Sequence, residues 1–511
     1  MMLKLAEIFQ DHMILQRTLP IRLWGTSDCE QQVAVWLNDR LIFKDQIPKG
    51  TFTLELAGQE AMEDAVLTLE SDSGETLTFS HVDIGEVWIA GGQSNMEFLL
   101  QYDREGETAA KLPADTHLRY YEVGKYAFEG EREEGLKDDA HWNCWKAFSL
   151  ENAPWFSAVG IYFALQLKER LEVPVGIIGC NWGGTTAAAW MDRELLAQDD
   201  VLRVYTDEYE NNTKNLDMEK YLAKNLMIRR RSANPAVAAN QAKVMKNENM
   251  RKPGWRDRLL AKLYSRGLMC GPQDENRPGG LYETMLKKIA GFSCAGVVWY
   301  QGEADEGHAD IYSRLFSQLI ECWRKDWNQR LPFLFVQLAP FEAWMGCTGR
   351  NFPQVRQQQQ WVEDHVADAY MASITDVGSR YDIHPKEKRA AGERLAALAL
   401  NKIYGEPVGC EAPRLGSIRK IEGQLIVSFI NAGNGLKLGE GHGLESLFCV
   451  LKGGQKLDCQ VKVDGELIRL ISDAVTPGGE YSVSFGYMPY MKMPLYNRDG
   501  LPAKPFGPVN V

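Results

Sequence analysis

Two short segments place small and hydroxyl residues where an acyl group could be attacked. Residues 91–97 read GGQSNME, with Ser94 directly after an apolar run. Glycines allow a tight turn, and a helix that follows would direct its first N–H groups at the serine, where they would stabilise an oxyanion. The alternative is a serine that only caps the helix. Residues 181–186 read NWGGTT, and Gly183 or Gly184 would let a backbone N–H approach a ligand, although a plain turn explains the same letters.

Two later segments supply an amide and an imidazole. Residues 299–305 read WYQGEAD, where the Gln301 side chain could donate to the same oxyanion or satisfy local backbone. Residues 381–385 read YDIHP, where His384 has the chemistry of a base for a serine and Asp382 that of the carboxylate that orients it. A histidine before a helix is also a common structural feature. The four segments together predict hydrolysis through a serine nucleophile.

The elements around these segments indicate an α/β domain. Each of the first three follows, or ends, a continuous apolar run, which is typical of a strand buried on both faces of a parallel sheet. Amphipathic helices are predicted over 160–171 and 311–327, and a helical run over 390–403. We therefore expect a three-layer α/β/α domain with a parallel sheet. The predicted buried strands are 86–90, 175–180, 295–300, 333–338 and 370–375.

Alternating patterns flank this domain on both sides. Short period-two segments broken by turn residues occur over 21–70 and return after about residue 405, which predicts β-sandwich-like domains at each end. The expected division is 1–82, 83–405 and 406–511. A polar stretch at about 200–262 indicates a helical insertion. The N-terminal strands are predicted at 21–25, 32–37, 51–56 and 65–70.

Composition narrows the partners. The 511 residues carry a net charge of −12, so nucleic acid and anionic membranes would be approached against repulsion, and we expect neither as a partner. The start of the chain has no apolar run of signal-peptide length, and no later run reaches about 20 apolar residues, which favours a cytoplasmic protein. Ten cysteines without a C-x-x-C pair suit a reducing compartment and offer no metal site. A homo-oligomer is left open.

The ordered segments resemble those of the SGNH hydrolases, and specifically the sialate O-acetylesterase family with its carbohydrate acetylesterase relatives. The pair GQSNM and WYQGE is the most specific part of the likeness, and the C-terminal YNRDGLPAKPF extends it. The resemblance covers nearly the whole chain apart from 200–262. It implies a flavodoxin-like SGNH domain and hydrolysis of O-acetyl esters on carbohydrates through an acetyl-serine intermediate, with no metal or organic cofactor.

The resemblance also implies a role for each residue. Ser94 becomes the nucleophile and His384 the base, while the Ser94 N–H, an N–H from Gly183 or Gly184 and the Gln301 amide form the oxyanion hole. Gln301 stands where the wider superfamily has asparagine. Superfamily members usually place Asp three residues before His, a position that is Tyr381 here. The D-x-H-P form of residues 382–385 resembles the sialate O-acetylesterase branch, so the acid is assigned to Asp382, with Asp376 as the substitute.

The substrate is an acetylated mono- or oligosaccharide, with acetylated sialic acid and acetylated xylo- or manno-oligosaccharides both open. Candidate contacts with it are Gln93, Asn95, Trp182, Trp299 and Glu303, with Trp190 and Tyr300 as further stacking platforms and Arg277 and Arg380 as partners for a sialate carboxylate. Core packing is the alternative for the aromatic residues, at least half of which we expect it to explain, and a structural role is the alternative for Glu303. Two alternatives are a carbohydrate-binding protein on a degenerate scaffold and a lipid or thioester hydrolase. The polar insertion provides no apolar lid for the latter.

Overall fold

The computed structural model describes residues 3–137, 139–256, 271–433, 435–439 and 443–511, and the chain forms two compact units. Unit 1 comprises residues 1–247, 269–299 and 317–333, and unit 2 comprises 248–268, 300–316 and 334–511. The chain passes several times from one unit to the other. The boundaries at 82/83 and 405/406 stay predictions.

The N-terminal strands of unit 1 are amphipathic. Every second residue of β4 (Gln31–Leu37) is buried, as expected for a strand with one face on a core. Strand β3 (Ile21–Ser27) pairs with β1 and β6, and β4 pairs with β5 and β7, all antiparallel. All four strands predicted over 21–70 are confirmed. The remaining bounds are β1 (Leu3–Leu5), β2 (Ile14–Gln16), β5 (Arg40–Ile47), β6 (Gly50–Leu56) and β7 (Met62–Ser71).

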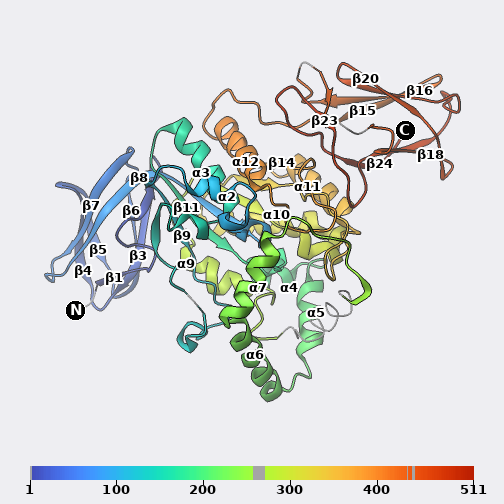
Figure 1. Cartoon of the computed structure of the whole chain (residues 1–511). Helices are drawn as coiled ribbons and strands as arrows, with labels where there is room; N and C mark the ends of the chain where they lie inside the picture. Colours follow the sequence, from blue (N-terminus) through green and yellow to red (C-terminus); the bar gives the residue numbers. More distant parts are fainter. Residues whose placement is uncertain (1–2, 138, 257–270, 434, 440–442) are drawn as a thin grey trace. The chain divides into compact units, whose positions relative to one another are not determined.

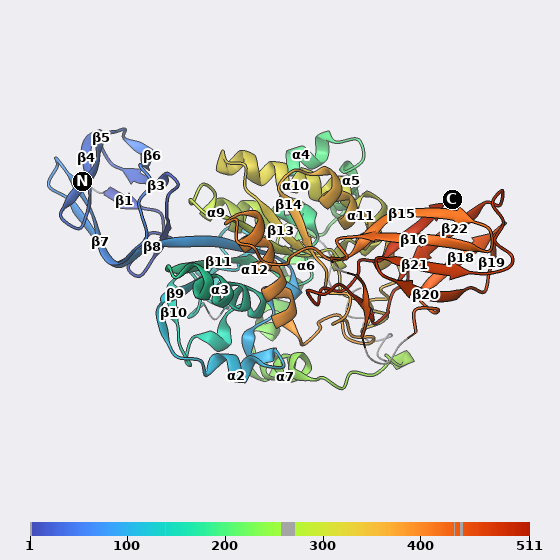
Figure 2. The ribbon, with the colours of Figure 1, turned by 90° about the horizontal axis from the view of Figure 1, so that it is seen from above.

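Strand β8 (Thr76–Gly92) runs from the N-terminal strands into the central sheet of unit 1 (Figure 2). Its beginning pairs with β7, and its buried second half lies parallel to β11 (Val175–Asn181). The order in unit 1 is β10-β9-β11-β8-β12. The sheet is mixed, which corrects the expectation of a parallel sheet, because the edge strand β10 returns antiparallel beside β9. The bounds are β9 (Asp115–Glu122), β10 (Trp145–Phe148) and β12 (Gly296–Tyr300).

Helices of unit 1 cover this sheet and fill the predicted insertion. Helix α3 (Ala158–Leu171) packs against β11 and β9, and the Ser157 hydroxyl caps it by accepting from the Gly160 N–H at 3.1 Å. Helices occupy most of this stretch up to residue 246, residues 247–254 form no helix, and 257–262 lie outside the described residues (Figure 1). The helices are α1 (Ser94–Glu97), α2 (Gly106–Ala110), α4 (Arg193–Gln198), α5 (Arg203–Thr213), α6 (Met218–Ser232), α7 (Pro235–Lys246) and α9 (Lys287–Ile289).

Unit 2 has its own α/β part. Strands β13 (Phe333–Val336) and β14 (Ala369–Ala372) are adjacent, and α11 (Phe352–His365) and α12 (Lys388–Lys402) pack against β14. A kinked 3-10 helix (Glu303–Ile311) follows β12 and leads into α10 (Tyr312–Trp327), through which the chain returns to unit 1. The buried strands and the helices predicted from the sequence are thus confirmed as elements.

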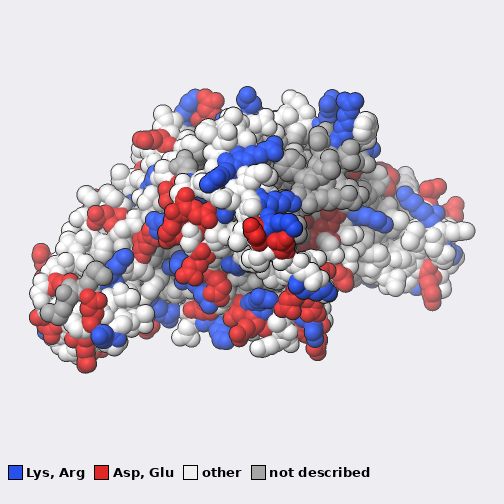
Figure 3. Space-filling model, turned by 90° about the horizontal axis from the view of Figure 1, so that it is seen from below, with Lys and Arg blue, Asp and Glu red and all other residues white. Residues whose placement is uncertain are grey.

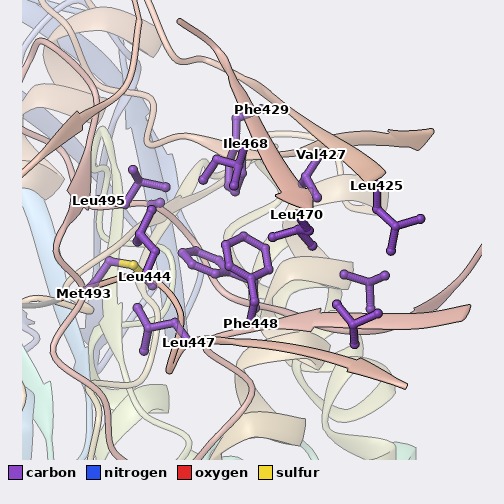
Figure 4. Close-up of a cluster of buried hydrophobic side chains, with 14 of the residues drawn as sticks. Leu425, Val427, Phe429, Leu444, Leu447, Phe448, Ile468, Leu470, Met493 and Leu495 are labelled. Carbon is purple, nitrogen blue, oxygen red and sulfur yellow. The ribbon is translucent and has the colours of Figure 1, made fainter. Parts of the chain in front are cut away.

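The C-terminal strands of unit 2 enclose one hydrophobic cluster. The sheets β15-β16-β21-β20 and β19-β18-β22-β24 both contribute side chains to it (Figure 4). Phe448 and Phe485 lie with ring centroids 4.6 Å apart. The bounds are β15 (Arg414–Ile421), β16 (Gln424–Ile430), β17 (Lys437–Leu438), β18 (Phe448–Lys452), β19 (Gln455–Lys456), β20 (Gln460–Asp464), β21 (Leu467–Ile471), β22 (Tyr481–Phe485), β23 (Leu495–Tyr496) and β24 (Phe506–Asn510).

The surface is charged and mixed. Acidic and basic side chains are interspersed over the face in Figure 3, in keeping with the excess of 69 acidic over 57 basic residues. Among the described residues, no helix combines the length and the apolar character that crossing a membrane requires.

Candidate active site

Ser94 begins the short helix α1, immediately beyond the buried end of β8. Gly92 has φ 133°, a conformation that side chains rarely adopt, and Gly91 leaves room for the indole of Trp299, which a Cβ would approach to 2.9 Å. The residue at the cap position of α1 is Gln93, without a side-chain capping bond. Ser94 is therefore not the cap of this helix, which removes the alternative reading of the serine.

The second segment lies directly beside the first. Asn181 is paired with Gly92 in the parallel register of β11 and β8, and the Trp182 N–H donates to the Gly92 carbonyl at 3.1 Å. A Cβ on Gly183 would lie 3.2 Å from the Ser94 Cβ, so only glycine allows this approach without displacement. The two loops therefore lie side by side in unit 1.

The two glycines differ in what their N–H groups do. The Gly183 N–H donates to the Glu97 carboxylate at 2.5 Å. Gly184 has φ 78° and is exposed, and among the hydrogen bonds of the described residues none uses its N–H. Of the two glycines, only Gly183 thus uses its N–H to hold the loop.

An ionic network of a buried lysine and two partly exposed acids adjoins the serine loop. The Lys125 ammonium lies 2.7 Å from Glu97 and 2.9 Å from Glu122. Burial disfavours the lysine charge, but the two carboxylates outweigh burial and raise the pKa of Lys125. Burial also raises the pKa of Glu122, against the effect of the lysine. The network keeps one ammonium between two acids.

In unit 2, Gln301 is fully buried and held on both sides of its amide. Its Nε2 donates to Asp305 at 2.5 Å, and its Oε1 accepts from the Tyr312 hydroxyl at 3.0 Å. These two bonds fix which end of the amide is the donor. An amide nitrogen carries two hydrogens, so the bond to Asp305 does not exhaust its capacity to donate.

His384 and Asp382 form a buried pair in unit 2. The distance from Asp382 Oδ1 to His384 Nδ1 is 3.6 Å, and the same oxygen accepts from the His384 backbone N–H at 2.9 Å. Lys386 lies 2.8 Å from the other carboxylate oxygen. At 3.6 Å the contact between the carboxylate and the imidazole is longer than a hydrogen bond, and catalytic contacts of this kind often shorten only when substrate binds. Trp344 contacts the imidazole edge-on, with centroids 5.2 Å apart.

These surroundings set the charge of the pair. Burial opposes the Asp382 charge, but bonds from His384 and the Lys386 ammonium outweigh burial and lower the pKa of the carboxyl. Burial lowers the pKa of His384, Lys388 adds to the effect, and Asp382 opposes it. The pair therefore holds a carboxylate next to a neutral imidazole, the protonation state a general base requires.

Asp376 has a different partner. Both of its carboxylate oxygens accept from the Arg394 guanidinium, at 2.7 and 2.8 Å. A bidentate pair of this kind fixes both groups. Of the two carboxylates considered for the triad, Asp382 is the one in contact with His384.

A family model for a carbohydrate esterase, sialic acid-specific acetylesterase, matches residues 271–401, which include Gln301, Asp382 and His384. The sialate O-acetylesterase of Mus musculus is 27% identical over 353 residues, covering 65% of this chain and 59% of its own length. That of Rattus norvegicus is 26% identical, covering 70% and 62%. A carbohydrate acetylesterase structure from Xanthomonas citri is 27% identical with a TM-score of 0.74, and 98% of each chain is covered.

The chain is similar to sialate O-acetylesterases in sequence and to a carbohydrate acetylesterase in sequence and fold. The resemblance predicted from the sequence is thereby confirmed, and the likeness to the Xanthomonas citri protein shows that it extends over the whole fold. The chain spans about three fifths of the length of the curated mammalian members that it matches, 59% and 62%.

Several of the predicted substrate contacts lie in the core. Trp299 is 1% exposed and packs edge-on against Trp323, and Trp190 is fully buried with its indole N–H on Thr185. Both side chains are core residues, so of the two roles considered for them the burial favours core packing over stacking on a sugar. Tyr300 is likewise buried.

The polar candidates are also mostly enclosed. Gln93, Asn95 and Glu303 are 3%, 0% and 7% exposed, which is comparable to Gln301 at 0% and His384 at 5%, so their contact with substrate stays a prediction. Trp182 is partly exposed, with the Lys137 ammonium 4.2 Å from its ring centroid. Trp182 is the one aromatic candidate of the set that reaches the surface.

The two arginine candidates lie in different units. Arg380 is exposed, paired with Glu342 and stacked on Tyr490. Arg277 lines a pocket of about 680 Å³ in unit 1 together with Arg193 and Lys287. This pocket has both acidic and basic walls.

Sequence reasoning missed the acid and the lysine under the serine. Glu97 belongs to the GGQSNME segment and Lys125 follows β9, but neither stands at a spacing that predicts contact with Gly183. The only signal was an acidic residue three positions after the serine. The structure gathers Ser94, Gly183 and Glu97 in unit 1, and Gln301, Asp382 and His384 in unit 2.

Proposed function

We propose that the chain is a carboxylic ester hydrolase that removes O-acetyl groups from carbohydrates. The observation that carries the proposal is the buried Asp382–His384 pair within the residues that match the acetylesterase family model. A neutral imidazole against a carboxylate is the base that serine hydrolysis needs. The loop geometry of Ser94, with Gly183 beside it, supports the same chemistry.

In the proposed mechanism, Ser94 attacks the acetyl carbonyl while His384 accepts its proton. The Ser94 N–H, a glycine N–H of the 183–184 pair and the Gln301 amide stabilise the tetrahedral oxyanion. His384 then protonates the departing sugar oxygen, and water, activated by the same imidazole, hydrolyses the acetyl-serine. Asp382 holds the imidazole in one tautomer and stabilises its charged form. This assigns the catalytic residues to an SGNH-type three-layer domain at 83–405, flanked by β-sandwich-like domains at 1–82 and 406–511.

The proposed substrates are acetylated mono- or oligosaccharides. The mammalian relatives are named for sialate and the Xanthomonas citri relative for carbohydrate, so acetylated sialic acid and acetylated xylo- or manno-oligosaccharides are both included. Trp182 is the aromatic side chain best placed to contact a sugar ring, because it is partly exposed next to Gly183. A cytoplasmic site of action would restrict the substrate to imported sugars.

Acetate release from a panel of these sugars tests the proposal. Wild type is expected to release acetate from at least one class, and Ser94→Ala to lose about 10⁶-fold in kcat, as removal of a serine nucleophile does in other hydrolases. Incubation with an acetylated chromogenic ester followed by intact mass should show an acetyl adduct on wild type and none on Ser94→Ala. Equal acetate release by both proteins would refute the serine mechanism, and no release by wild type from any substrate would refute the activity.

A further inference from the structure

Glu97 makes a contact that no step of the proposed hydrolysis uses. Its Oε2 accepts the Gly183 N–H at 2.5 Å, and the same oxygen would lie 2.9 Å from a Cβ on Gly183. A charged acceptor at this distance forms one of the stronger hydrogen bonds available to a backbone N–H. Glu97 therefore ties the end of α1, three residues after Ser94, to the glycine that faces that serine.

A carboxylate so close to an oxyanion hole would oppose the negative charge that develops there. Lys125 removes this problem, because its ammonium lies 2.7 Å from the other oxygen of Glu97 and is itself only 10% exposed. Glu122, on the far side at 2.9 Å, fixes the ammonium between the two acids. Glu97 can thus hold the glycine loop while its charge is locally compensated.

The other residues of the 181–183 segment are also held by specific contacts. The Asn181 amide donates to the Ala90 carbonyl at 3.1 Å, which anchors the loop to β8. The Lys137 ammonium lies over Trp182 and donates to the Lys125 carbonyl at 2.5 Å. Each residue of 181–183 is therefore fixed by its own contact, while the exposed Gly184 follows with φ 78°.

We propose that Glu97 is a positioning residue of the oxyanion hole, which holds the 181–184 loop through Gly183 so that the Gly184 N–H, and not the Gly183 N–H, is the glycine donor to the substrate oxyanion. The inference rests on the proposed function, because it assigns the second donor of the same site. Lys125 is the counter-charge that makes a carboxylate tolerable there. Glu97 itself does not touch the reacting atoms.

Substitutions at Glu97 test this assignment. Glu97→Ala frees the Gly183 N–H and should lower kcat by about 10- to 100-fold, the range expected when a catalytic group is displaced by about 1 Å, with KM changed less than about 3-fold. Glu97→Gln keeps an oxygen acceptor for Gly183 and should restore kcat to within about 3-fold of wild type. Glu97→Asp, one methylene shorter, should fall between the two.

Glu107→Ala is the matched control, since Glu107 lies on α2 and pairs with Lys111 at the surface, 2.7 Å away. It should leave kcat and KM unchanged. Thermal unfolding of every variant reports on folding, and Glu97→Asp and Glu97→Gln, which keep a polar group at the site, carry the test if the alanine variant does not fold.

The outcomes distinguish a failure of the proposed function from a failure of the positioning role of Glu97. If wild type releases no acetate, the proposed function fails before Glu97 is considered. If wild type is active and Ser94→Ala is not, but Glu97→Ala and Glu97→Asp both match wild type in kcat, the positioning role is refuted. It is also refuted if a folded Glu97→Gln is as impaired as Glu97→Ala, or if the loss appears in KM rather than in kcat.

Discussion

At the scale of single residues, Asp382 and Asp376 differ in their contacts, which bear on the choice between the preferred acid and its substitute. Asp382 touches His384, while Asp376 is bound on both oxygens by Arg394. The usual superfamily spacing pointed to neither, since Tyr381 stands at that position. The position of an acid relative to the histidine in the sequence does not show which side chain that acid contacts.

Substitution of the two acids should have different consequences. Asp382→Asn removes the charge that stabilises the imidazolium and favours the wrong tautomer, so kcat should fall by about 10⁴-fold, as in other serine hydrolases. Asp376→Asn should leave kcat within a few-fold of wild type but lower the free energy of unfolding by about 3–5 kcal/mol, because it leaves the partly buried Arg394 without its partner. Acetate release and urea denaturation measure the two effects. The reverse pattern would assign the acid to Asp376.

The pH profile reports on His384. The base acts when neutral, so kcat/KM falls as pH drops through its pKa. Burial, with a smaller effect from Lys388, lowers that pKa below the ordinary 6.5, so the acidic limb should lie below pH 6.5. Replacing Lys388 with Met removes a positive charge near the imidazole and should move the limb to higher pH.

Lys402→Met is the control for this shift, because Lys402 ends the same helix α12 and pairs with Glu411 instead. Its profile should coincide with that of wild type. The assignment of the limb to His384 would fail if Lys388→Met left the profile unmoved or displaced it toward acid.

At the scale of elements, alternation and apolar runs were sufficient to predict four N-terminal strands, β3, β4, β6 and β7, and the buried strands of the α/β part. Buried segments such as 175–180 and 86–90 became β11 and β8, because continuous apolar letters leave a strand no polar face. The antiparallel edge strand β10 was not predicted, since it is only Trp145–Phe148 and its pairing depends on β9. A sequence pattern predicts that a strand forms better than it predicts which strand it pairs with.

Side-chain networks were beyond sequence pattern for a related reason. Glu97 meets Lys125 and Gly183, which lie 28 and 86 positions further along the chain, through the register of three strands. The same limitation applies to Trp299, whose motif indicated a sugar platform but whose ring packs over Gly91 in the core. Only the packing of one strand on another decides which face is inside.

Strand β11 offers an element-scale prediction through Gly179. A Cβ there would lie 2.1 Å from Glu122 Oε2 and 2.2 Å from the Tyr120 hydroxyl, both buried. Gly179→Ala must therefore displace the acid that holds Lys125, and should lower the free energy of unfolding by about 1–3 kcal/mol. Gly478→Ala, where a Cβ meets nothing within 4 Å, should change it by less than about 0.5 kcal/mol. Equal urea midpoints for the two variants would contradict the steric argument.

At the scale of the molecule, hydrogen bonds and an ion pair connect the C-terminal segment to the α/β part of unit 2. The Met493 N–H donates to the Thr375 carbonyl at 3.2 Å, and the Thr375 hydroxyl donates to the Ala503 carbonyl at 3.1 Å. Lys504 reaches Glu363 on α11 at 2.5 Å. These bonds link the last segment of the chain to the helix and strand that precede His384. The sequence, read as three successive domains, gave no sign of them.

The Lys504–Glu363 pair therefore stabilises unit 2 as a whole. The side chains are 4% and 18% exposed, so Lys504→Met leaves an enclosed carboxylate without its partner and should lower the free energy of unfolding by about 3–5 kcal/mol at neutral pH. Arg414→Met removes a pair with Asp364 whose members are about one third exposed, 35% and 34%, and should cost less than about 1 kcal/mol. Urea denaturation compares the two.

The pH dependence of this difference identifies its cause. Burial opposes the Glu363 charge, but Lys504 outweighs burial and lowers the pKa of the carboxyl below its ordinary 4.5. A carboxyl with a lowered folded-state pKa stabilises the fold above its unfolded value, and this contribution is lost as pH falls through the folded value. The difference in the free energy of unfolding between wild type and Lys504→Met should therefore become smaller below pH 4.5, where Glu363 of the variant is protonated. A difference that stayed constant down to acid would show that Lys504 acts by packing its alkyl chain, and not by pairing with Glu363.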